Sequence, residues 1–247
     1  MELLRKAREL GVGVVQICDN MPLDKMSLQE LGELRAEADR LDIGIETGTR
    51  GVEPEHLLKY LKISNLLGAR LLRTMIQYNN GRSEIGKAAD SIKQVLGEFA
   101  GAGVSIAVEN YELVRSSELV EIIKAVDSEY VGVCLDTVNS FGALECPQSV
   151  IHELAPFAIN FHYKDFRISR ADHKMGFHIY GCPAGDGMLD ASYIRDTLRK
   201  HERNPNVILE LWTPFCGDIQ KTVEKEQDWA ERSIRFLGEV FGNEKKR

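Results

Sequence analysis

The sequence predicts an α/β fold, a (β/α)8 TIM barrel that forms a single domain over residues 1–247 and lacks its first strand. Seven short segments rich in β-branched residues alternate with helical stretches along the chain. Alternation of this kind implies parallel strands joined by right-handed crossovers, and a barrel of eight such units needs about 250 residues. A helical pattern already covers residues 1–10, so the missing element is the strand before the first helix.

The predicted elements follow from local patterns. The strand segments span residues 14–19, 43–48, 71–76, 104–110, 131–137, 158–165 and 207–213. Ser27 and Glu30 form a capping box that begins one of eight predicted helices, and Gly101 ends the helix predicted over 84–99. The long connection 166–189 is a candidate lid. An open doubly wound sheet is the alternative architecture, but no GxGxxG motif follows the first strand segment.

Composition argues against several classes of protein. The net charge of -7 disfavours a surface that binds nucleic acid. No apolar run approaches the roughly 20 residues needed to span a bilayer, and the N-terminal "MELLRKAREL" lacks the apolar core of a signal peptide. Five scattered cysteines without a CxxC pair predict free thiols in a reducing cytoplasm. We therefore expect a cytoplasmic protein with no nucleic-acid or membrane partner.

The two faces of each predicted strand differ in polarity. In a barrel, one face packs against the helices and must be apolar, so the polar face points toward the barrel axis. In "NFHYKDF" (160–166), this rule directs Asn160, His162 and Lys164 inward. The same rule directs these residues inward on the other strands: Gln16, Glu46, Arg73, Ser105, Ala107, Glu109, Gly132, Cys134, Asp136, Ile208, Glu210 and Trp212. Ionisable groups lie near the C-terminal strand ends, where such barrels carry their chemistry.

Four of the ionisable side chains are expected to converge and to form a metal site: Glu109, Asp136, His162 and Glu210. Three carboxylates close together cannot all stay ionised without a counter-charge, which one divalent cation would supply. One imidazole with three carboxylates suits Mn²⁺ as first choice, with Mg²⁺, Co²⁺ or Zn²⁺ also possible. The alternative is that each acid separately pairs with a cationic side chain, either Lys164, Arg167 or Arg73.

Five short motifs carry these residues and their surroundings: "AVEN" with Glu109, "CLDT" with Asp136, "NFHYKD" with His162, "PAGDGMLD" with Asp190 and "LELW" with Glu210. Over nearly the whole chain, the sequence resembles the xylose isomerase-like TIM-barrel superfamily of sugar isomerases, epimerases and AP endonucleases. The resemblance implies that the four side chains hold one divalent metal and that Glu109 and Glu210 exchange protons with the substrate. Asn139 departs from the histidine that family epimerases often have, and the family's substrate-binding arginine corresponds to Arg167.

The candidates for substrate binding are the polar and aromatic residues around this set: Lys164, Arg167, Asn139, Trp212, Glu46 and Arg73. Lys164 could polarise a carbonyl group, or it could pair with Asp136 or Glu109. Trp212 could stack on a sugar ring or serve as a core aromatic residue. Glu46 and Arg73 lie inward on adjacent strands, and we expect them to pair with each other rather than to contact substrate.

The function expected from these residues is a metal-dependent isomerase or epimerase of a small sugar or keto-polyol. One glutamate would remove a proton beside the carbonyl, the metal would hold the enediolate, and the other glutamate would return a proton. Three alternatives remain open: a dehydratase or 3-keto-glycoside lyase on the same site, an AP-endonuclease-like DNA repair enzyme, and a non-catalytic sugar-binding barrel. The expected partner is a small carbohydrate, and a homo-oligomer is possible.

Overall fold

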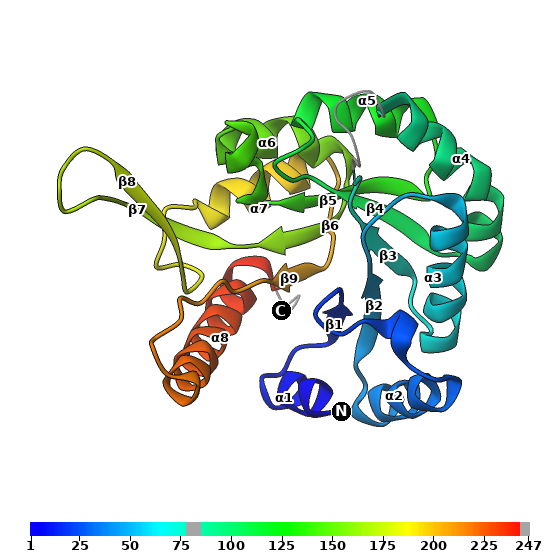
Figure 1. The fold of residues 1–247 in the computed structure, drawn as a ribbon, viewed down its shortest axis with the longest axis horizontal. Helices are drawn as coiled ribbons and strands as arrows, with labels where there is room; N and C mark the ends of the chain where they lie inside the picture. The colour runs from blue at the N-terminus through cyan, green and yellow to red at the C-terminus, as the bar shows by residue number, and fades with distance from the viewer. Residues whose placement is uncertain (78–84, 243–247) are drawn as a thin grey trace, which may run out of the picture.

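A sheet of seven parallel strands forms the centre of the molecule (Figure 1), and the computed structural model describes residues 1–77 and 85–242. The strand order is β1-β2-β3-β4-β5-β6-β9. Their bounds are β1 Val14–Ile17, β2 Gly44–Gly48, β3 Leu71–Thr74, β4 Ser105–Glu109, β5 Val131–Asp136, β6 Ala158–Tyr163 and β9 Val207–Leu209. Each lies inside one of the predicted segments, so the predicted TIM-barrel fold is confirmed.

The barrel wall has a seam between its first and last strands. In the part of the chain that the structure describes, no backbone ladder joins β9 to β1. A wall of seven strands fits the strand that the sequence predicts to be missing. β1 and β9 are therefore the two edges of the sheet, and Figure 1 shows them on either side of the interruption.

Eight α-helices among the described residues follow or precede the strands and lie outside the sheet (Figure 1). They are α1 Glu2–Glu9, α2 Leu28–Leu41, α3 Pro54–Leu67, α4 Ile85–Ala102, α5 Ser116–Val126, α6 Pro147–Leu154, α7 Ala191–Lys200 and α8 Ile219–Phe241. Short 3-10 turns are η1 Leu23–Lys25, η3 Asn139–Ala143 and η4 Ala155–Phe157. No helix in these described ranges is long and apolar enough to cross a membrane.

Two predicted helix boundaries have different outcomes. The capping box at α2 is confirmed, because the Ser27 hydroxyl accepts a hydrogen bond from the Glu30 amide and the Glu30 carboxylate accepts one from the Ser27 amide. The prediction that Gly101 ends the helix predicted over 84–99 is wrong, since this helix, α4, continues to Ala102. Gly103 follows with φ of 64°, a left-handed conformation that glycine adopts without a Cβ penalty. Residue 84, the predicted start of this helix, lies outside the described residues.

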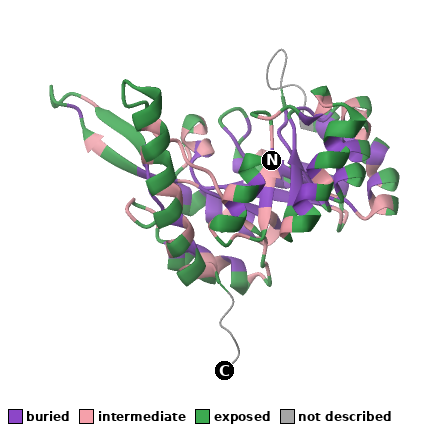
Figure 2. Ribbon diagram, turned by 90° about the horizontal axis from the view of Figure 1, so that it is seen from below, coloured by how far each residue is buried: buried purple, intermediate pink, exposed green. Residues whose placement is uncertain are grey.

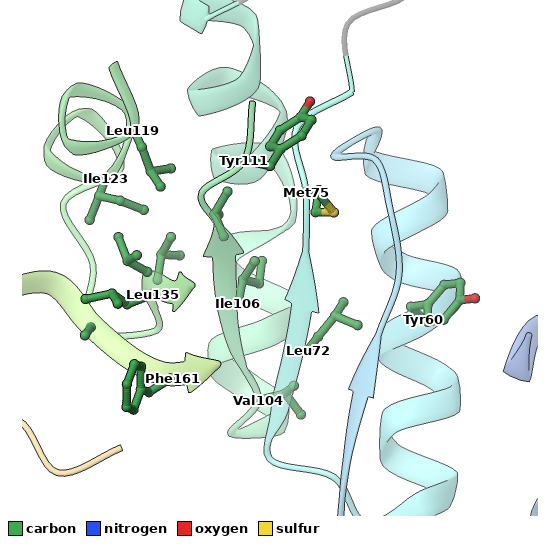
Figure 3. Close-up of a cluster of buried hydrophobic side chains, with 14 of the residues drawn as sticks. Tyr60, Leu72, Met75, Val104, Ile106, Tyr111, Leu119, Ile123, Leu135 and Phe161 are labelled. Carbon is green, nitrogen blue, oxygen red and sulfur yellow. The ribbon is translucent and has the colours of Figure 1, made fainter. Parts of the chain in front are cut away.

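The hydrophobic core lies mainly between the strands and the helices (Figures 2 and 3). Leu72 and Ile106 are both 0% exposed and belong to this core. Each fully buried side chain of this size stabilises the fold by about 1.5–3 kcal/mol. Their neighbours Leu71 and Ala107 belong to a separate small cluster with Cys134. Successive residues of a strand therefore alternate between the main core and the small inner cluster, as the strand pattern predicts.

The segment 166–189 does not act as a lid in this structure. β7 (Asp165–Arg170) and β8 (Phe177–Cys182) pair as an antiparallel hairpin. The hairpin projects away from the barrel in both views, and most of it is exposed (Figures 1 and 2). The expectation that this connection covers the strand ends is therefore wrong for the observed arrangement. Strand pairing within the segment satisfies its own backbone groups without requiring contact with the barrel mouth.

Candidate active site

The four predicted metal ligands meet at the C-terminal ends of the last strands. Glu109 ends β4, Asp136 ends β5, His162 is the penultimate position of β6, and Glu210 follows β9. One ligand atom from each lies within 4.8 Å of the others. Asp136 and His162 are register partners across β5 and β6, which explains their proximity. The structure thus brings together four side chains that are up to 101 positions apart in the sequence.

The donor atoms of this cluster fit a divalent cation. Asp136 Oδ2, His162 Nδ1 and Glu210 Oε2 are buried and have no hydrogen-bond partner. His162 Nδ1 lies 3.0 Å from Glu210 Oε2 and 3.5 Å from Glu109 Oε2, but neither contact has hydrogen-bond geometry. The two carboxylate oxygens each lie 3.1 Å from Lys164 Nζ, whereas His162 Nδ1 has only the two carboxylate contacts just described. Buried polar atoms are nearly always hydrogen-bonded, so three that are not, within reach of one another, leave room for a further ligand. Oxygen and imidazole donors suit a hard or borderline metal ion.

Asp136 is held rigidly by backbone contacts. Its Oδ1 accepts hydrogen bonds from the amides of Val138 at 2.8 Å and Asn139 at 2.7 Å. The Asn110 side chain accepts from the Asp136 amide at 2.7 Å and donates to its carbonyl at 3.0 Å. Oδ2 is thereby left facing the cluster. Sequence reasoning missed the role of Asn110, although it follows Glu109 directly in the "AVEN" motif.

Both oxygens of Glu109 are engaged. Arg73 forms a buried ion pair with Oε2 through its Nε, and Asn139 Nδ2 donates to Oε1 at 2.6 Å. Burial alone would raise the pKa of Glu109, but His162 and Arg73 outweigh it and hold that pKa well below its usual range. The expected pair between Glu46 and Arg73 is therefore wrong. Arg73 on β3 pairs instead with Glu109 on the neighbouring strand β4.

Lys164 links the acids of the cluster to Asn139. Its Nζ lies 3.1 Å from Asp136 Oδ2, 3.1 Å from Glu210 Oε2 and 2.9 Å from Asn139 Oδ1. Burial would lower the pKa of Lys164, but Asp136 and Glu210 outweigh this effect and the net shift is upward. Lys164 is thus held as an ammonium group. Of the two alternative pairings, the one with Asp136 is confirmed, whereas the described contacts show no ion pair with Glu109.

Glu46, Trp212 and Arg167 form no hydrogen bond or ion pair with the four ligands among the described contacts. Both oxygens of Glu46 accept hydrogen bonds from side-chain amides. Trp212 Nε1 donates to the Asp165 carbonyl at 3.0 Å, so its indole N–H anchors the base of the hairpin. Arg167 is exposed on β7, and no hydrogen bond or ion pair among the described residues joins it to the cluster. Their roles in substrate binding stay predictions.

Glu210 is more exposed to solvent than the other three residues of the candidate metal site. The side chain of Glu210 is 42% exposed, whereas those of Glu109 and His162 are 0% and 3% exposed. The pKa of Glu210 is lowered, because the contacts with His162 and Lys164 outweigh the effect of its burial. Of the four, Glu210 is therefore the group best placed to touch a substrate and to exchange protons with water.

Residues 4–240 match the family described as the xylose isomerase-like TIM barrel. The chain belongs to this family. It is similar to 3-oxo-isoapionate decarboxylase from Pectobacterium atrosepticum, with 36% identity over 95% of this chain and 86% of the relative. A second relative, the protein YihM from Escherichia coli, is 25% identical over 68% of this chain and 52% of its own length.

Solved structures of the family share the fold. A D-psicose 3-epimerase determined in the presence of D-fructose superimposes with a TM-score of 0.77 and 17% identity over 98% of this chain and 93% of that one. A family member from Mycobacterium smegmatis in complex with magnesium gives a TM-score of 0.75 and 16% identity over 98% and 87% of the two chains. At these identities the likeness establishes the barrel fold.

Proposed function

We propose that this protein is a metal-dependent lyase that decarboxylates a small sugar acid with a ketone at C3. The observation that carries this choice is that Arg73 and Asn139 occupy both oxygens of Glu109. An epimerase needs one group that removes a proton and a second that returns one. Arg73 and Asn139 stabilise the ionised form of Glu109 and so make it a weak base, while a lone pair on each oxygen stays available to a metal. Loss of carbon dioxide needs no base. The similarity to 3-oxo-isoapionate decarboxylase along 95% of the chain supports the same choice.

The four residues that would hold the metal are Glu109, Asp136, His162 and Glu210. When bound, a divalent cation would act as a Lewis acid on the ketone oxygen and a neighbouring hydroxyl, stabilising negative charge that develops there. Mn²⁺ is our first choice and Mg²⁺, Co²⁺ or Zn²⁺ are alternatives, because three carboxylates and one imidazole form a predominantly hard ligand set.

The chain's own residues supply charge and a proton. The bond between the carboxylate carbon and C2 breaks, its electron pair moves toward C3 and its oxygen, and carbon dioxide leaves. C2 of the resulting enediolate then takes a proton from the Lys164 ammonium group. Glu210 lies 3.1 Å from Lys164 and reaches solvent, so it relays a replacement proton to the lysine. Asp136, also 3.1 Å away, keeps the ammonium group in place between turnovers.

The isomerase or epimerase expected from the sequence is the second candidate. It is favoured by the presence of both Glu109 and Glu210 in one cluster, as proton transfer on two faces of a substrate requires. For this chemistry, the Glu109 carboxylate would have to take up a proton beside the positive charge of Arg73, which lowers the pKa of Glu109. The two candidates therefore differ in whether Glu109 exchanges protons with the substrate.

The test is to incubate the Mn²⁺-loaded protein in D₂O with a 3-oxo sugar acid and, separately, with ketohexoses. We expect carbon dioxide to form faster than in the enzyme-free control, with one deuterium at the former C2 of the product. Lys164→Met should retain metal and lose this activity. Exchange of a ketose C–H with solvent, without carbon dioxide release from the acid, would replace the lyase by the epimerase.

Location and assembly are further proposals. Five cysteines are free thiols, which supports a reducing cytoplasm as the location. The hairpin exposes Met175, Phe177 and Ile179, and exposed apolar groups of this size support self-association. Light scattering coupled to size-exclusion chromatography, with Phe177→Ser as the comparison variant, tests the homo-oligomer: a monomeric wild-type protein would contradict it.

A further inference from the structure

Gln16 on β1 contacts the histidine of the candidate metal site from below. Its Oε1 lies 2.7 Å from His162 Nε2 on β6. An amide oxygen can only accept a hydrogen bond, so Nε2 must carry a proton. Nδ1 is then the nitrogen available to a metal, and it is the unpaired nitrogen that faces Glu109 and Glu210. Gln16 therefore selects which histidine nitrogen serves the site.

The orientation of the Gln16 amide is itself determined by Glu46. Glu46 Oε2 accepts from Gln16 Nε2 at 3.0 Å and from Asn160 Nδ2 at 2.9 Å. A carboxylate accepts only, so both amides must turn their NH₂ groups toward it. Turning the Gln16 amide over would place its oxygen against the carboxylate. Its observed orientation directs Oε1 to His162.

Asn160 reinforces this arrangement. Its Oδ1 accepts from Gln16 Nε2 at 2.9 Å and from the Cys134 thiol at 3.2 Å. The Gln16 NH₂ group thus has two acceptors, Glu46 and Asn160. These two contacts and the contact with His162 require the same orientation of the Gln16 amide. Buried amide networks of this kind have a single low-energy arrangement when all members are satisfied.

The same side chains connect strands on both sides of the barrel seam. Glu46 on β2 accepts from Asn206, just before β9, at 2.6 Å through its other oxygen. Gln16 on β1 bonds to Asn160 and His162 on β6. The described strands β1 and β9 share no backbone ladder. Side-chain amides, not backbone groups, therefore hold this side of the barrel in register beneath the metal site.

We propose that Glu46 and Gln16 are positioning residues that fix the tautomer and direction of His162, so that the metal affinity of the site depends on a carboxylate that does not touch the metal. This inference rests on the metal site of the proposed function but not on the reaction it catalyses. Partners behind a ligating histidine typically change metal affinity 10–100-fold when removed. Glu46 acts through Gln16, one hydrogen bond further away.

The test compares Gln16→Leu and Glu46→Gln with the wild-type protein. Thr47→Val is the matched control, because Thr47 is the next residue on β2 and loses a buried hydrogen bond to Ser64, outside the network. Mn²⁺ affinity is measured by calorimetry. The imidazole of His162 is observed by ¹⁵N NMR in the Zn²⁺-loaded protein and in the metal-free protein at high pH, its signal being assigned from its absence in His162→Ala.

We expect wild type and Thr47→Val to show a proton on Nε2 of His162. Gln16→Leu should bind Mn²⁺ about tenfold or more weakly than wild type and show a mixture of His162 tautomers. Glu46→Gln should also bind Mn²⁺ more weakly and show a mixture of His162 tautomers. Unchanged tautomer and affinity in both variants, or an equal loss in Thr47→Val, would overturn the proposal. Absence of metal binding in the wild type would defeat the proposed function, while the metal-free spectra would still test the tautomer.

Discussion

Replacement of Arg73 by methionine tests the buried pair on which the choice of a lyase depends. Arg73→Met keeps the length of the side chain and removes its charge. The side chains of Arg73 and Glu109 are 7% and 0% exposed, so the carboxylate would remain in the barrel without one of its two neighbouring cations. Removing one member of a buried pair costs about 3–5 kcal/mol of folding free energy. His162 Nδ1 lies 3.5 Å from the same oxygen and offsets part of this cost, so we expect about 3 kcal/mol.

Urea denaturation of the metal-free protein measures this loss, with the slope of the transition checked for constancy. Arg50→Met is the comparison variant, because Arg50 pairs with Asp19 at the exposed surface and such pairs contribute at most about 1 kcal/mol. In the double variant Arg73→Met/Glu109→Leu, no uncompensated charge remains, and we expect much of the stability to return.

A loss below about 1 kcal/mol in Arg73→Met would refute the reasoning. It would mean that Glu109 is solvated or protonated without Arg73, and that the acid is free to act as a base. The argument against an epimerase would then fail. An equally large loss in the double variant would instead assign the effect of Arg73 to packing and not to charge.

Three further changes have definite expected outcomes. Lys164→Met should lower kcat by about 10²–10⁴-fold while metal content by mass spectrometry stays unchanged. Glu37→Gln should remove stability that is present above pH 4.5 and is lost as pH falls toward about 2, because Arg40 lowers the pKa of Glu37 to about 2; acid titration of unfolding checks this. Gly132→Ala should cost about 1–3 kcal/mol, since a Cβ there would lie 2.7 Å from the Phe157 carbonyl; thermal unfolding measures it.

Each of these has a contradicting result. Loss of bound metal in Lys164→Met would show that the lysine supports the ligands and not the proton transfer. Identical acid unfolding of Glu37→Gln and wild type would show that the pair between Arg40 and Glu37 contributes nothing in solution. A Gly132→Ala protein as stable as wild type would show that the strand after η4 moves to accept the extra methyl group.

Much of the candidate site was predictable because strand alternation is a local property. Once Val108 and Leu135 are assigned to the helix side, Glu109 and Asp136 must face the axis, and their positions at strand ends place them at one rim. The same rule found His162 and Glu210. Asn110 was not predictable in this way, since it acts on the backbone of Asp136 in the neighbouring strand.

The hairpin formed by β7 and β8 was mispredicted for a different reason. A long connection between a strand and a helix is typical of loops that cover barrel mouths. Whether such a segment bends over the mouth or pairs with itself depends on contacts at its base. Here Asp165, at the start of β7, accepts from the amides of Gly185 and Gly187 at 2.9 Å and 3.1 Å, which joins the two ends of the hairpin.

By itself, the sequence determined the α/β class, the seven strands, the inward face of each strand and the four candidate ligands. These depend on residue periodicity and on the solvent preference of each face. Only the tertiary structure decided the partner of each inward charge. Arg73 is in register with Gly48 on β2 and with Ala107 on β4, so Glu46 lies two residues below it and Glu109 two residues above. Register is a product of packing between distant segments, and it assigned Arg73 to Glu109 and left Glu46 to the amides behind His162.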